Sequence, residues 1–296
     1  MKVLITGSNG LLGQKLSDLL LAEKVDFLAT GKGDNRNPST GVNYQRLDIT
    51  ADDTSIIDQY QPDVVINTAA MTNVDLCESE QEGCLNLNVR SVERLVDACN
   101  RVGSHFIHLS TDFIFDGTKS MYTELDQPNP LSFYGNSKLL AEQYIQKNSK
   151  KFSIIRTVLV YGIVADMSRS NIVLWAKGAL EKKQKIAVVN DQFRTPTLAE
   201  DLAMGCYLVA DNGKEGIYHI CGKDYMNIYE LVERVSKHYD LSMENVSVSS
   251  SHNLNQVAKR PPITGLDISK AQRDLGYHPH SFEEGLELLD KQMNSN

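Results

Sequence analysis

The first half of the chain alternates short apolar runs with segments whose apolar residues recur at helical spacing. The segments "LLGQKLSDLLLAE", "LNVRSVERLVDACNRVG" and "SKLLAEQYIQK" place apolar residues three and four positions apart, as amphipathic helices do. Between such segments, apolar or β-branched runs occupy residues 2–6, 26–30, 44–49, 63–70, 106–111 and 153–162. Strands that read as continuous apolar runs are buried on both faces, which is typical of parallel sheets built from βαβ units. The pattern predicts an α/β fold, a Rossmann-like doubly wound parallel sheet.

After Gly162 the regular alternation ends. Helical patterns now alternate with short apolar segments and a polar loop, "DQFRTPT" at residues 191–197. We expect residues 1–162 to form a nucleotide-binding Rossmann domain. We expect residues 163–296 to form mainly a smaller, interleaved substrate-binding lobe, with residues from about 190 to 212 returning to the first domain.

The composition limits the kinds of partner that the protein is expected to bind. The 296 residues are 41% hydrophobic and 23% charged, with a net charge of −8, so the average field of the protein repels polyanions. This argues against nucleic acid and against an anionic membrane as partners, and no apolar stretch is long enough to span a bilayer. The five cysteines contain no Cys-x-x-Cys pair, as expected of reduced thiols in the cytoplasm. The sequence leaves open whether the chain forms a homodimer.

A glycine-rich loop follows the first apolar run directly and leads into the first helical pattern. Glycines at this spacing allow a tight turn and a close approach to a pyrophosphate, and the helix N-terminus offers free N–H groups to the phosphates. The position in the first βα turn favours a dinucleotide cofactor over a plain turn. The loop contributes Gly7, Asn9, Gly10, Leu11, Leu12 and Gly13 as candidate cofactor-binding residues.

The end of the second apolar run bears on which dinucleotide binds. An NAD site usually places an Asp or Glu about twenty residues beyond the loop, where it accepts from the ribose 2′-hydroxyl. This chain has Thr30, Gly31 and Lys32 there. Because a lysine suits a 2′-phosphate better, NADP(H) is favoured and NAD(H) is the alternative.

Residues after the third and fourth runs complete the predicted cofactor site. Asp48 and Ile49 follow the third run, where they would edge the adenine. Ala69 and Ala70 follow the fourth run, and their small side chains would let the cofactor pass close to the backbone. Each of these residues could equally be a packing residue.

The stretch "YGNSK" carries the candidate chemistry. Tyr134 and Lys138 lie four residues apart in a helical pattern and therefore share one face, and Thr111 ends the fifth apolar run. Tyrosine titrates near pH 10, so an acid–base role needs a neighbouring cation to stabilise its phenolate. We expect Thr111 to hold a substrate carbonyl, Tyr134 to protonate its oxygen, and Lys138 to tune Tyr134 while binding the nicotinamide ribose.

The glycine loop occurs together, and in the same order along the chain, with "INTAAMTNVDLCESE", "LNVRSVERL", "STDFIFDGT", "NPLSFYGNSKLLAEQ", "IIRTVLVYG" and "VVNDQFRTPT". In these segments the chain resembles the extended short-chain dehydrogenase/reductases and, within them, the dTDP-4-dehydrorhamnose reductases. The resemblance implies that Thr111, Tyr134 and Lys138 are the catalytic triad, and that Asn88 supports the site. It also implies reduction of the C4 ketone of a nucleotide-linked 6-deoxyhexose, giving dTDP-L-rhamnose for bacterial surface polysaccharide.

The chain departs from that family at positions expected to face the substrate. Related dehydratases read Thr-Asp-Glu where this chain has Thr111, Asp112 and Phe113, so dehydration is disfavoured. The rhamnose reductases often carry a tyrosine at the position of Phe113 and a tryptophan at that of Leu159. These differences leave the identity of the sugar undecided.

Two arginines are candidate ligands of the substrate diphosphate. Arg194 lies in the 191–197 loop, and Arg260 lies in "AKRPP" beside Lys259. Guanidinium groups grip phosphate oxygens in a fork geometry, although a surface salt bridge is an equal alternative for Arg194. The seven histidines show no ligand spacing, so no metal site is expected.

Two other functions compete with the leading one. The first is a reductase or epimerase of a different nucleotide sugar, which Leu159 and Arg194 favour. The second is a non-catalytic, NADP-binding regulatory subunit that keeps the cofactor fold. The intact set of Thr111, Tyr134 and Lys138 argues against a pure binding module.

Overall fold

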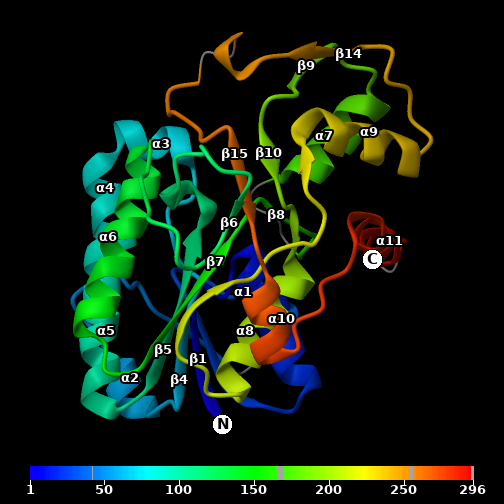
Figure 1. Ribbon diagram of the computed structural model, residues 1–296. Coiled ribbons are helices and arrows are strands. Elements are labelled where there is room, and N and C mark those ends of the chain that lie inside the picture. Colours follow the sequence, from blue (N-terminus) through cyan, green and yellow to red (C-terminus); the bar gives the residue numbers. More distant parts are fainter. Residues whose placement is uncertain (42, 166–169, 254–255, 295–296) are drawn as a thin grey trace.

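The computed structural model describes residues 1–41, 43–165, 170–253 and 256–294. Its main element is a seven-stranded sheet in the order β12-β7-β5-β4-β1-β2-β3, in which every neighbouring pair is parallel (Figure 1). The predicted doubly wound α/β fold is confirmed. The strands are β1 (Lys2–Thr6), β2 (Asp26–Gly31), β3 (Tyr44–Arg46), β4 (Val64–Asn67), β5 (His105–Thr111), β7 (Phe152–Thr157) and β12 (Gly216–His219).

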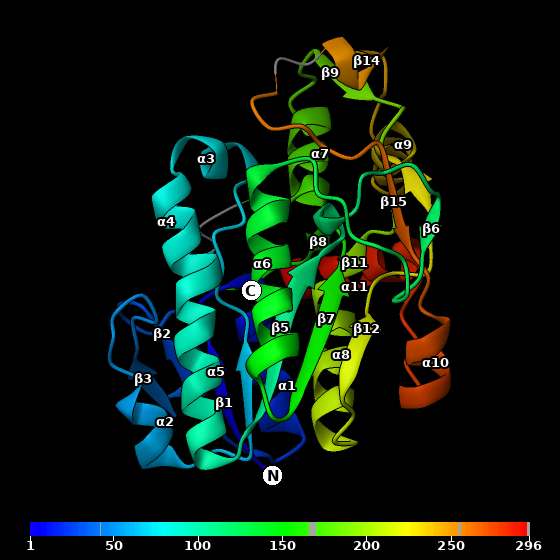
Figure 2. The ribbon, with the colours of Figure 1, turned by 60° about the vertical axis from the view of Figure 1, so that its left-hand side comes forward.

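Alternate residues of each central strand enter different cores, because successive side chains of a strand point to opposite faces. Val3 and Ile5 pack in a core shared with α1 (Leu11–Ala22) and α8 (Ala199–Asp211). Leu4 packs on the other face. Figure 2 shows the helices of that second face in front of the sheet. They are α2 (Ser55–Tyr60), α5 (Ser91–Val102) and α6 (Phe133–Asn148).

A smaller lobe stands beyond the carboxyl ends of the strands, at the top of Figure 1. Its core forms between α7 (Ile172–Glu181), α9 (Ile228–His238) and α11 (Phe282–Asn294). A second sheet runs in the order β13-β10-β15-β6, and β14 pairs with β9. These strands are β6 (Met121–Tyr122), β9 (Ile186–Val189), β10 (Phe193–Arg194), β13 (Met226–Asn227), β14 (Val246–Ser249) and β15 (Ile263–Leu266).

The two parts of the chain exchange elements. From the second half, α8 packs against α1 and β12 pairs with β7, whereas β6 from the first half pairs with β15 of the lobe. A domain boundary near residue 162 therefore stays a proposal about the chain's organisation. The remaining elements are α3 (Val74–Ser79), α4 (Gln81–Leu85), β8 (Val160–Tyr161), β11 (Thr197–Leu198), α10 (Ser269–Leu275), a π-helical turn η2 (Asn86–Arg90), and the 3₁₀ turns η1 (Pro38–Thr40), η3 (Asp112–Ile114) and η4 (Ser251–Asn253).

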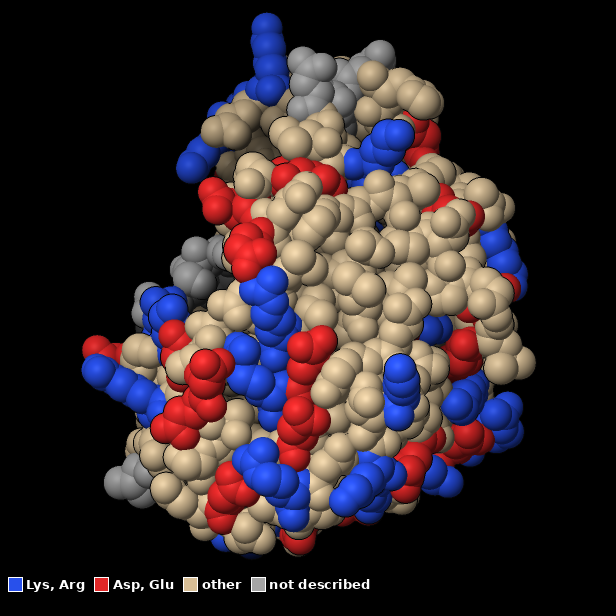
Figure 3. Space-filling model, turned by 90° about the vertical axis from the view of Figure 1, so that its left-hand side faces the viewer, with Lys and Arg blue, Asp and Glu red and all other residues tan. Residues whose placement is uncertain are grey.

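Charged side chains of both signs are interspersed on the face that Figure 3 shows. Exposed ion pairs such as Arg90 with Glu82 and Arg101 with Asp58 join neighbouring helices. Among the described residues, no helix combines the length and the apolar character that crossing a bilayer requires.

Candidate active site

The glycine loop brings the backbones of β1 and β4 together. Gly7 has a φ of +72°, and a Cβ placed on it would lie 2.7 Å from the backbone nitrogen of Ala69. A Cβ on Gly13 would lie 2.5 Å from the carbonyl oxygen of Gly7. Gly10 caps α1 without a side-chain hydrogen bond. The start of α1 therefore presents backbone N–H groups at the loop, as a pyrophosphate site requires.

Asn9 ties the glycine loop to the segment after β2. Its Nδ2 donates to the carbonyl oxygen of Asp34 at 2.9 Å and to the hydroxyl of Tyr44 at 3.1 Å. Its Oδ1 accepts from the backbone nitrogen of Arg36 at 2.9 Å. Asn9 thus shapes the loop around the expected adenosine end. No sequence motif points to Tyr44, which reaches Asn9 only because β3 pairs with β2.

The residues expected at the adenosine end lie in different surroundings. The Lys32 ammonium is 3.0 Å from a carboxylate oxygen of Asp48, and the Lys32 side chain is 79% exposed. A solvated lysine at the end of β2 is accessible to a 2′-phosphate. Ile49 is buried in the core on the α5 side of the sheet, so packing accounts for it. Ala69 backs Gly7, and Ala70 lines the cavity described next.

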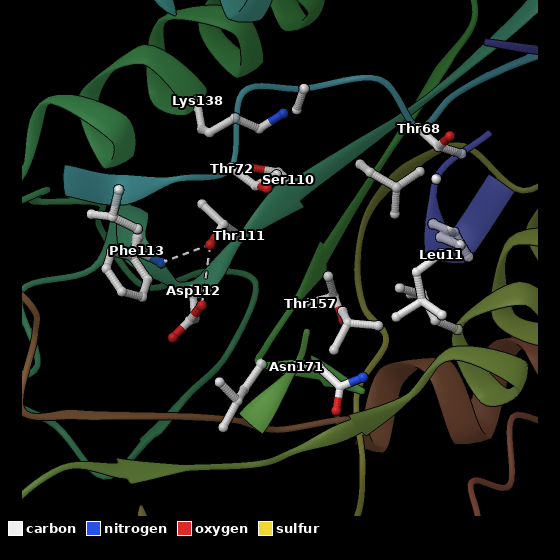
Figure 4. A pocket seen from close by; sticks show the side chains of 18 of the residues that line it. Leu11, Thr68, Thr72, Ser110, Thr111, Asp112, Phe113, Lys138, Thr157 and Asn171 are labelled. Carbon is white, nitrogen blue, oxygen red and sulfur yellow. Dashed lines mark hydrogen bonds between the residues drawn. The ribbon is translucent and has the colours of Figure 1, made fainter. Parts of the chain in front are cut away.

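A cavity of about 680 Å³ lies at the carboxyl ends of the strands, where the strand order reverses between β1 and β4. This is where doubly wound sheets bind their ligands. Figure 4 shows Leu11 and Thr68 on one side of it, and Thr111, Asp112 and Phe113 on the other. The cavity brings together most of the predicted site residues: Asn9, Gly10, Leu11, Leu12, Gly13, Ala70, Thr111, Asp112, Phe113, Tyr134, Lys138, Leu159, Arg194 and Arg260.

The start of α6 sets the position of Tyr134. Ser132 caps the helix by accepting from the backbone nitrogen of Gly135 at 3.2 Å. A Cβ on Gly135 would overlap the carbonyl oxygen of Phe113, so this glycine lets α6 approach η3 closely. Tyr134 and Phe113 consequently stack edge to face, with ring centroids 5.8 Å apart. The close approach places the phenol beside the end of β5.

The three predicted catalytic side chains are all buried at the cavity. Thr111 is 6% exposed, Tyr134 8% and Lys138 2%. Burial raises the pKa of Tyr134, while a hydrogen bond with Thr111 lowers it. Burial lowers the pKa of Lys138 to about 8, and the carboxylate of Glu142 opposes this shift. The site therefore holds a protonated phenol beside a lysine that titrates near neutral pH.

Asn88 lies in the π-helical turn between α4 and α5 and connects two walls of the site. Its Oδ1 accepts from the backbone nitrogen of Met71 at 2.8 Å. Its Nδ2 donates to the Ser137 hydroxyl and to the Met71 carbonyl, both at 3.1 Å. π-turns inside helices often mark functional sites. Asn88 thus ties the segment after β4 to the helix that carries Tyr134.

Arg194 is buried in the cavity wall and is not exposed on the surface. The alternative of a surface salt bridge is wrong, because Arg194 is only 4% exposed. Its guanidinium donates to the carbonyl oxygens of Phe193, Pro262 and Pro261, at 2.7, 3.1 and 2.8 Å, and lies 3.7 Å from Asp112. These contacts hold Arg194 in the cavity wall, and a role at the substrate diphosphate stays a prediction.

Arg260 spans the two parts of the molecule. Its guanidinium contacts both carboxylate oxygens of Asp75 in α3, at 3.1 and 2.7 Å. The backbone nitrogen of Ala258 also donates to Asp75, at 3.0 Å. Arg260 lines the cavity, so a role at the diphosphate stays a prediction. Asp75 is the partner that holds this segment.

Two other wall residues have unusual features. Leu159 has a φ of +41°, in a region that residues with a Cβ rarely adopt. The hydroxyl of Ser110 is buried and has no hydrogen-bond partner among the described residues. A buried polar group without a partner is uncommon and is expected where a ligand completes the hydrogen bonding. Ser110 lines the cavity and is not among the residues that the motifs predict for the site.

A second cavity of about 340 Å³ adjoins the first on the side of the smaller lobe. Phe113, Leu159, Arg194 and Arg260 line both cavities, so they stand at the junction. The second cavity is otherwise mostly apolar and is lined by Ile172, Trp175, Ala187, Val188, Val189 and Ile228, with Gln192 and Gln256 as polar members. Among the described residues, no group of three or more His, Cys, Asp and Glu could hold a metal ion.

The family model described as "RmlD substrate binding domain" matches residues 1–295. The chain belongs to this family. The resemblance to the rhamnose reductases noted from the motifs is thereby confirmed, and the chain is an NAD(P)-dependent oxidoreductase of the RmlD substrate binding domain family.

Individual proteins also match this chain along most of their length. A dTDP-4-dehydrorhamnose reductase of Aggregatibacter actinomycetemcomitans is 32% identical over 97% of this chain and 98% of its own. The crystal structure of the Bacillus anthracis dTDP-4-dehydrorhamnose reductase in complex with NADP is 27% identical, with a TM-score of 0.86 over 98% of this chain and 99% of its own. Methionine adenosyltransferase 2 subunit beta of Danio rerio is 29% identical over 92% of this chain and 84% of its own.

Proposed function

We propose that this chain reduces the C4 ketone of dTDP-4-dehydro-L-rhamnose to give dTDP-L-rhamnose, with NADPH preferred over NADH. The observation that carries the proposal is the convergence of Thr111, Tyr134 and Lys138 on one cavity that begins at the glycine loop. The relative from Aggregatibacter actinomycetemcomitans, named for this activity, supports it.

The residues present fit a dinucleotide. The loop from Gly7 to Gly13 would hold the pyrophosphate at the start of α1, where side chains larger than hydrogen collide with the backbone. Lys32 would contact the 2′-phosphate, and the NADP complex of the Bacillus anthracis relative supports this preference. Asp48 beside it would edge the adenine. When bound, the reduced nicotinamide supplies the hydride.

The chain's own residues would polarise the ketone and deliver the proton. The Thr111 hydroxyl would donate to the ketone oxygen. Tyr134 would give its phenolic proton to that oxygen as the carbon gains the hydride, so that an alcohol and a phenolate result. Lys138 would stabilise the phenolate by its charge and bind the nicotinamide ribose. The buried environment of all three strengthens these interactions.

The proposal is tested by following NADPH absorbance with purified protein and dTDP-4-dehydro-L-rhamnose. We expect turnover, and a higher kcat/KM with NADPH than with NADH. Turnover only with a UDP- or GDP-linked ketosugar would reject the substrate and support the alternative of another nucleotide-sugar reductase. A lack of turnover with every ketosugar, with NADPH still bound, would favour the regulatory subunit.

The second cavity is the proposed site of the substrate's base. Trp175 is 40% exposed and offers an aromatic face beside the apolar wall. Gln192 is 6% exposed, and its side-chain amide nitrogen Nε2 has no hydrogen-bond partner among the described residues. A buried amide donor without a partner suits a carbonyl oxygen on the rim of a pyrimidine such as thymine.

Replacing Gln192 with Leu removes this donor and keeps the volume. We expect KM for the dTDP-sugar to rise about 3- to 10-fold, the value of one neutral hydrogen bond, with kcat nearly unchanged. The KM for NADPH in the same variant is the internal control and should not move. An unchanged KM for the sugar would remove Gln192 from base recognition.

We also propose a location in the cell and an assembly state for the chain. All five cysteines are buried and none forms a disulfide, which supports a cytoplasmic location, where thiols stay reduced. A homodimer stays a prediction, and the elution volume in size-exclusion chromatography with light scattering measures it directly.

A further inference from the structure

His108 is buried behind the catalytic lysine. It lies on β5 with 0% exposure, and its Nε2 is 3.0 Å from the Nζ of Lys138. Its Nδ1 is 3.1 Å from the Nδ2 of Asn67 on the neighbouring strand β4. Asn67 is 1% exposed. Both ring nitrogens therefore face nitrogen atoms, and a neutral imidazole can donate from only one of its own.

The backbone fixes which end of the Asn67 amide faces His108. The backbone nitrogen of Ala69, which can only donate, lies 3.3 Å from Oδ1 of Asn67. The hydroxyl of Thr6 donates to the same oxygen at 2.6 Å. If the amide turned over, two N–H donors would face each other at Ala69. The NH₂ group of Asn67 therefore points at Nδ1 of His108.

An amide nitrogen only donates, so Nδ1 of His108 must accept. The ring proton then stands on Nε2 and points at the Nζ of Lys138. We infer that Asn67 and His108 act as positioning residues that set the charge of Lys138, by holding His108 in the Nε2–H tautomer that donates to the neutral amine and opposes the ammonium.

Formation of the ammonium requires a change in this chain of hydrogen bonds. In total, Lys138 and His108 together take up one proton from solvent. Nζ of Lys138 gains a proton, Nε2 of His108 becomes an acceptor, and the ring carries its single proton on Nδ1. The Asn67 amide must then present its oxygen to Nδ1 and give up its bond with Ala69. The charge of Lys138 and the tautomer of His108 are thereby coupled.

The other titratable and charged groups around Lys138 leave this coupling in place. On α6 itself, Tyr134 and Glu142 flank it, and Glu142 is paired with Arg156 of β7 at 2.7 Å. Cys84 approaches from α4, and Asp112 from η3 and Cys77 from α3 lie by Tyr134. Burial, followed by the charge of Lys138, lowers the pKa of His108 well below its usual range, so the ring stays neutral while Lys138 titrates.

The inference rests on the roles proposed above for Tyr134 and Lys138. A neutral Lys138 leaves Tyr134 with its proton, which is the form that a reductase needs. An ammonium favours the phenolate that remains after proton transfer. The coupling between Asn67, His108 and Lys138 would therefore favour the neutral amine and the protonated phenol above the pKa of Lys138, about 8, and the ammonium below it.

The test is the tautomer of His108 in ¹⁵N-histidine-labelled protein, read from long-range ¹H–¹⁵N spectra, with the His108 signals assigned by their loss in His108→Gln. At pH 9.5 we expect the Nε2–H tautomer. As the pH falls to 6.5 we expect the Nδ1–H tautomer, with a midpoint near the pKa of Lys138, about 8, and no imidazolium. An Nδ1–H ring at pH 9.5, or an imidazolium near pH 7, would overturn the inference.

Two variants sharpen the test. Asn67→Asp replaces the NH₂ group with an acceptor, so His108 should adopt Nδ1–H at every pH, and the pH limb of kcat/KM that Lys138 controls should move up by one unit or more. Thr6→Val is the matched control. It removes the hydroxyl that donates to Oδ1 of Asn67 but keeps the backbone N–H of Ala69 as a donor to that oxygen. The tautomer of His108 and the pH profile of kcat/KM should therefore stay as in the wild type.

Persistence of Nε2–H in Asn67→Asp would contradict the inference. The wild-type spectrum needs no substrate, so its outcome is independent of whether the proposed sugar is turned over. A failed activity assay with the expected tautomers would reject the proposed function alone.

Discussion

Replacing Tyr134 with Phe lowers kcat for ketone reduction by about 10²- to 10⁴-fold, the usual contribution of a positioned general acid, and leaves NADPH binding nearly unchanged. The variant keeps the ring that packs edge to face against Phe113 and loses only the hydroxyl. Steady-state kinetics and fluorescence titration with NADPH measure the two effects separately.

Tyr144→Phe is the matched control for that variant. Tyr144 lies on the same helix, and its hydroxyl donates to Asp97 at 3.2 Å on the exposed side. This control should keep wild-type kcat. A Tyr134→Phe variant with unchanged kcat would contradict the assignment of the proton donor.

The second large effect is expected on stability. Glu142 and Arg156 form a buried ion pair with side-chain exposures of 0% and 3%, and two hydrogen bonds of 3.1 and 2.7 Å. Replacing Glu142 with Leu leaves the Arg156 charge buried without its partner. The free energy of unfolding should fall by about 3–5 kcal/mol, as measured by urea denaturation.

Removing both charges separates the burial of an unpaired charge from the loss of packing. In Glu142→Leu combined with Arg156→Met, no charge is left in the core, and most of the lost stability should return. Glu82→Gln, at an exposed pair with Arg90, should change the unfolding midpoint little. A double variant as unstable as Glu142→Leu would show that the ion pair is not the cause.

The sequence could predict features that local chemistry determines. The glycine loop, the helical spacing of Tyr134 and Lys138, and the position of Thr111 at a strand end each follow from a short segment and the geometry of parallel sheets. The structure places all of these at one cavity. The smaller lobe was predictable as a change of pattern after Gly162.

The sequence could not predict contacts between distant segments. Arg194 is held by the carbonyls of Pro261 and Pro262, 67 and 68 positions away. His108 and Asn67 lie within two of the apolar runs, and their contacts with Lys138 depend on the register of β4 with β5 and on the packing of α6 against the sheet. Such pairings are set by the packed fold, so no local motif reports them.

The most direct test of the proposed function uses NADPH carrying deuterium at the transferred position of C4 of its nicotinamide ring. With dTDP-4-dehydro-L-rhamnose, the product should be dTDP-L-rhamnose one mass unit heavier, with the deuterium at C4 of the sugar by NMR. Deuterium at another carbon, or unlabelled product, would contradict direct reduction of the C4 ketone by this site.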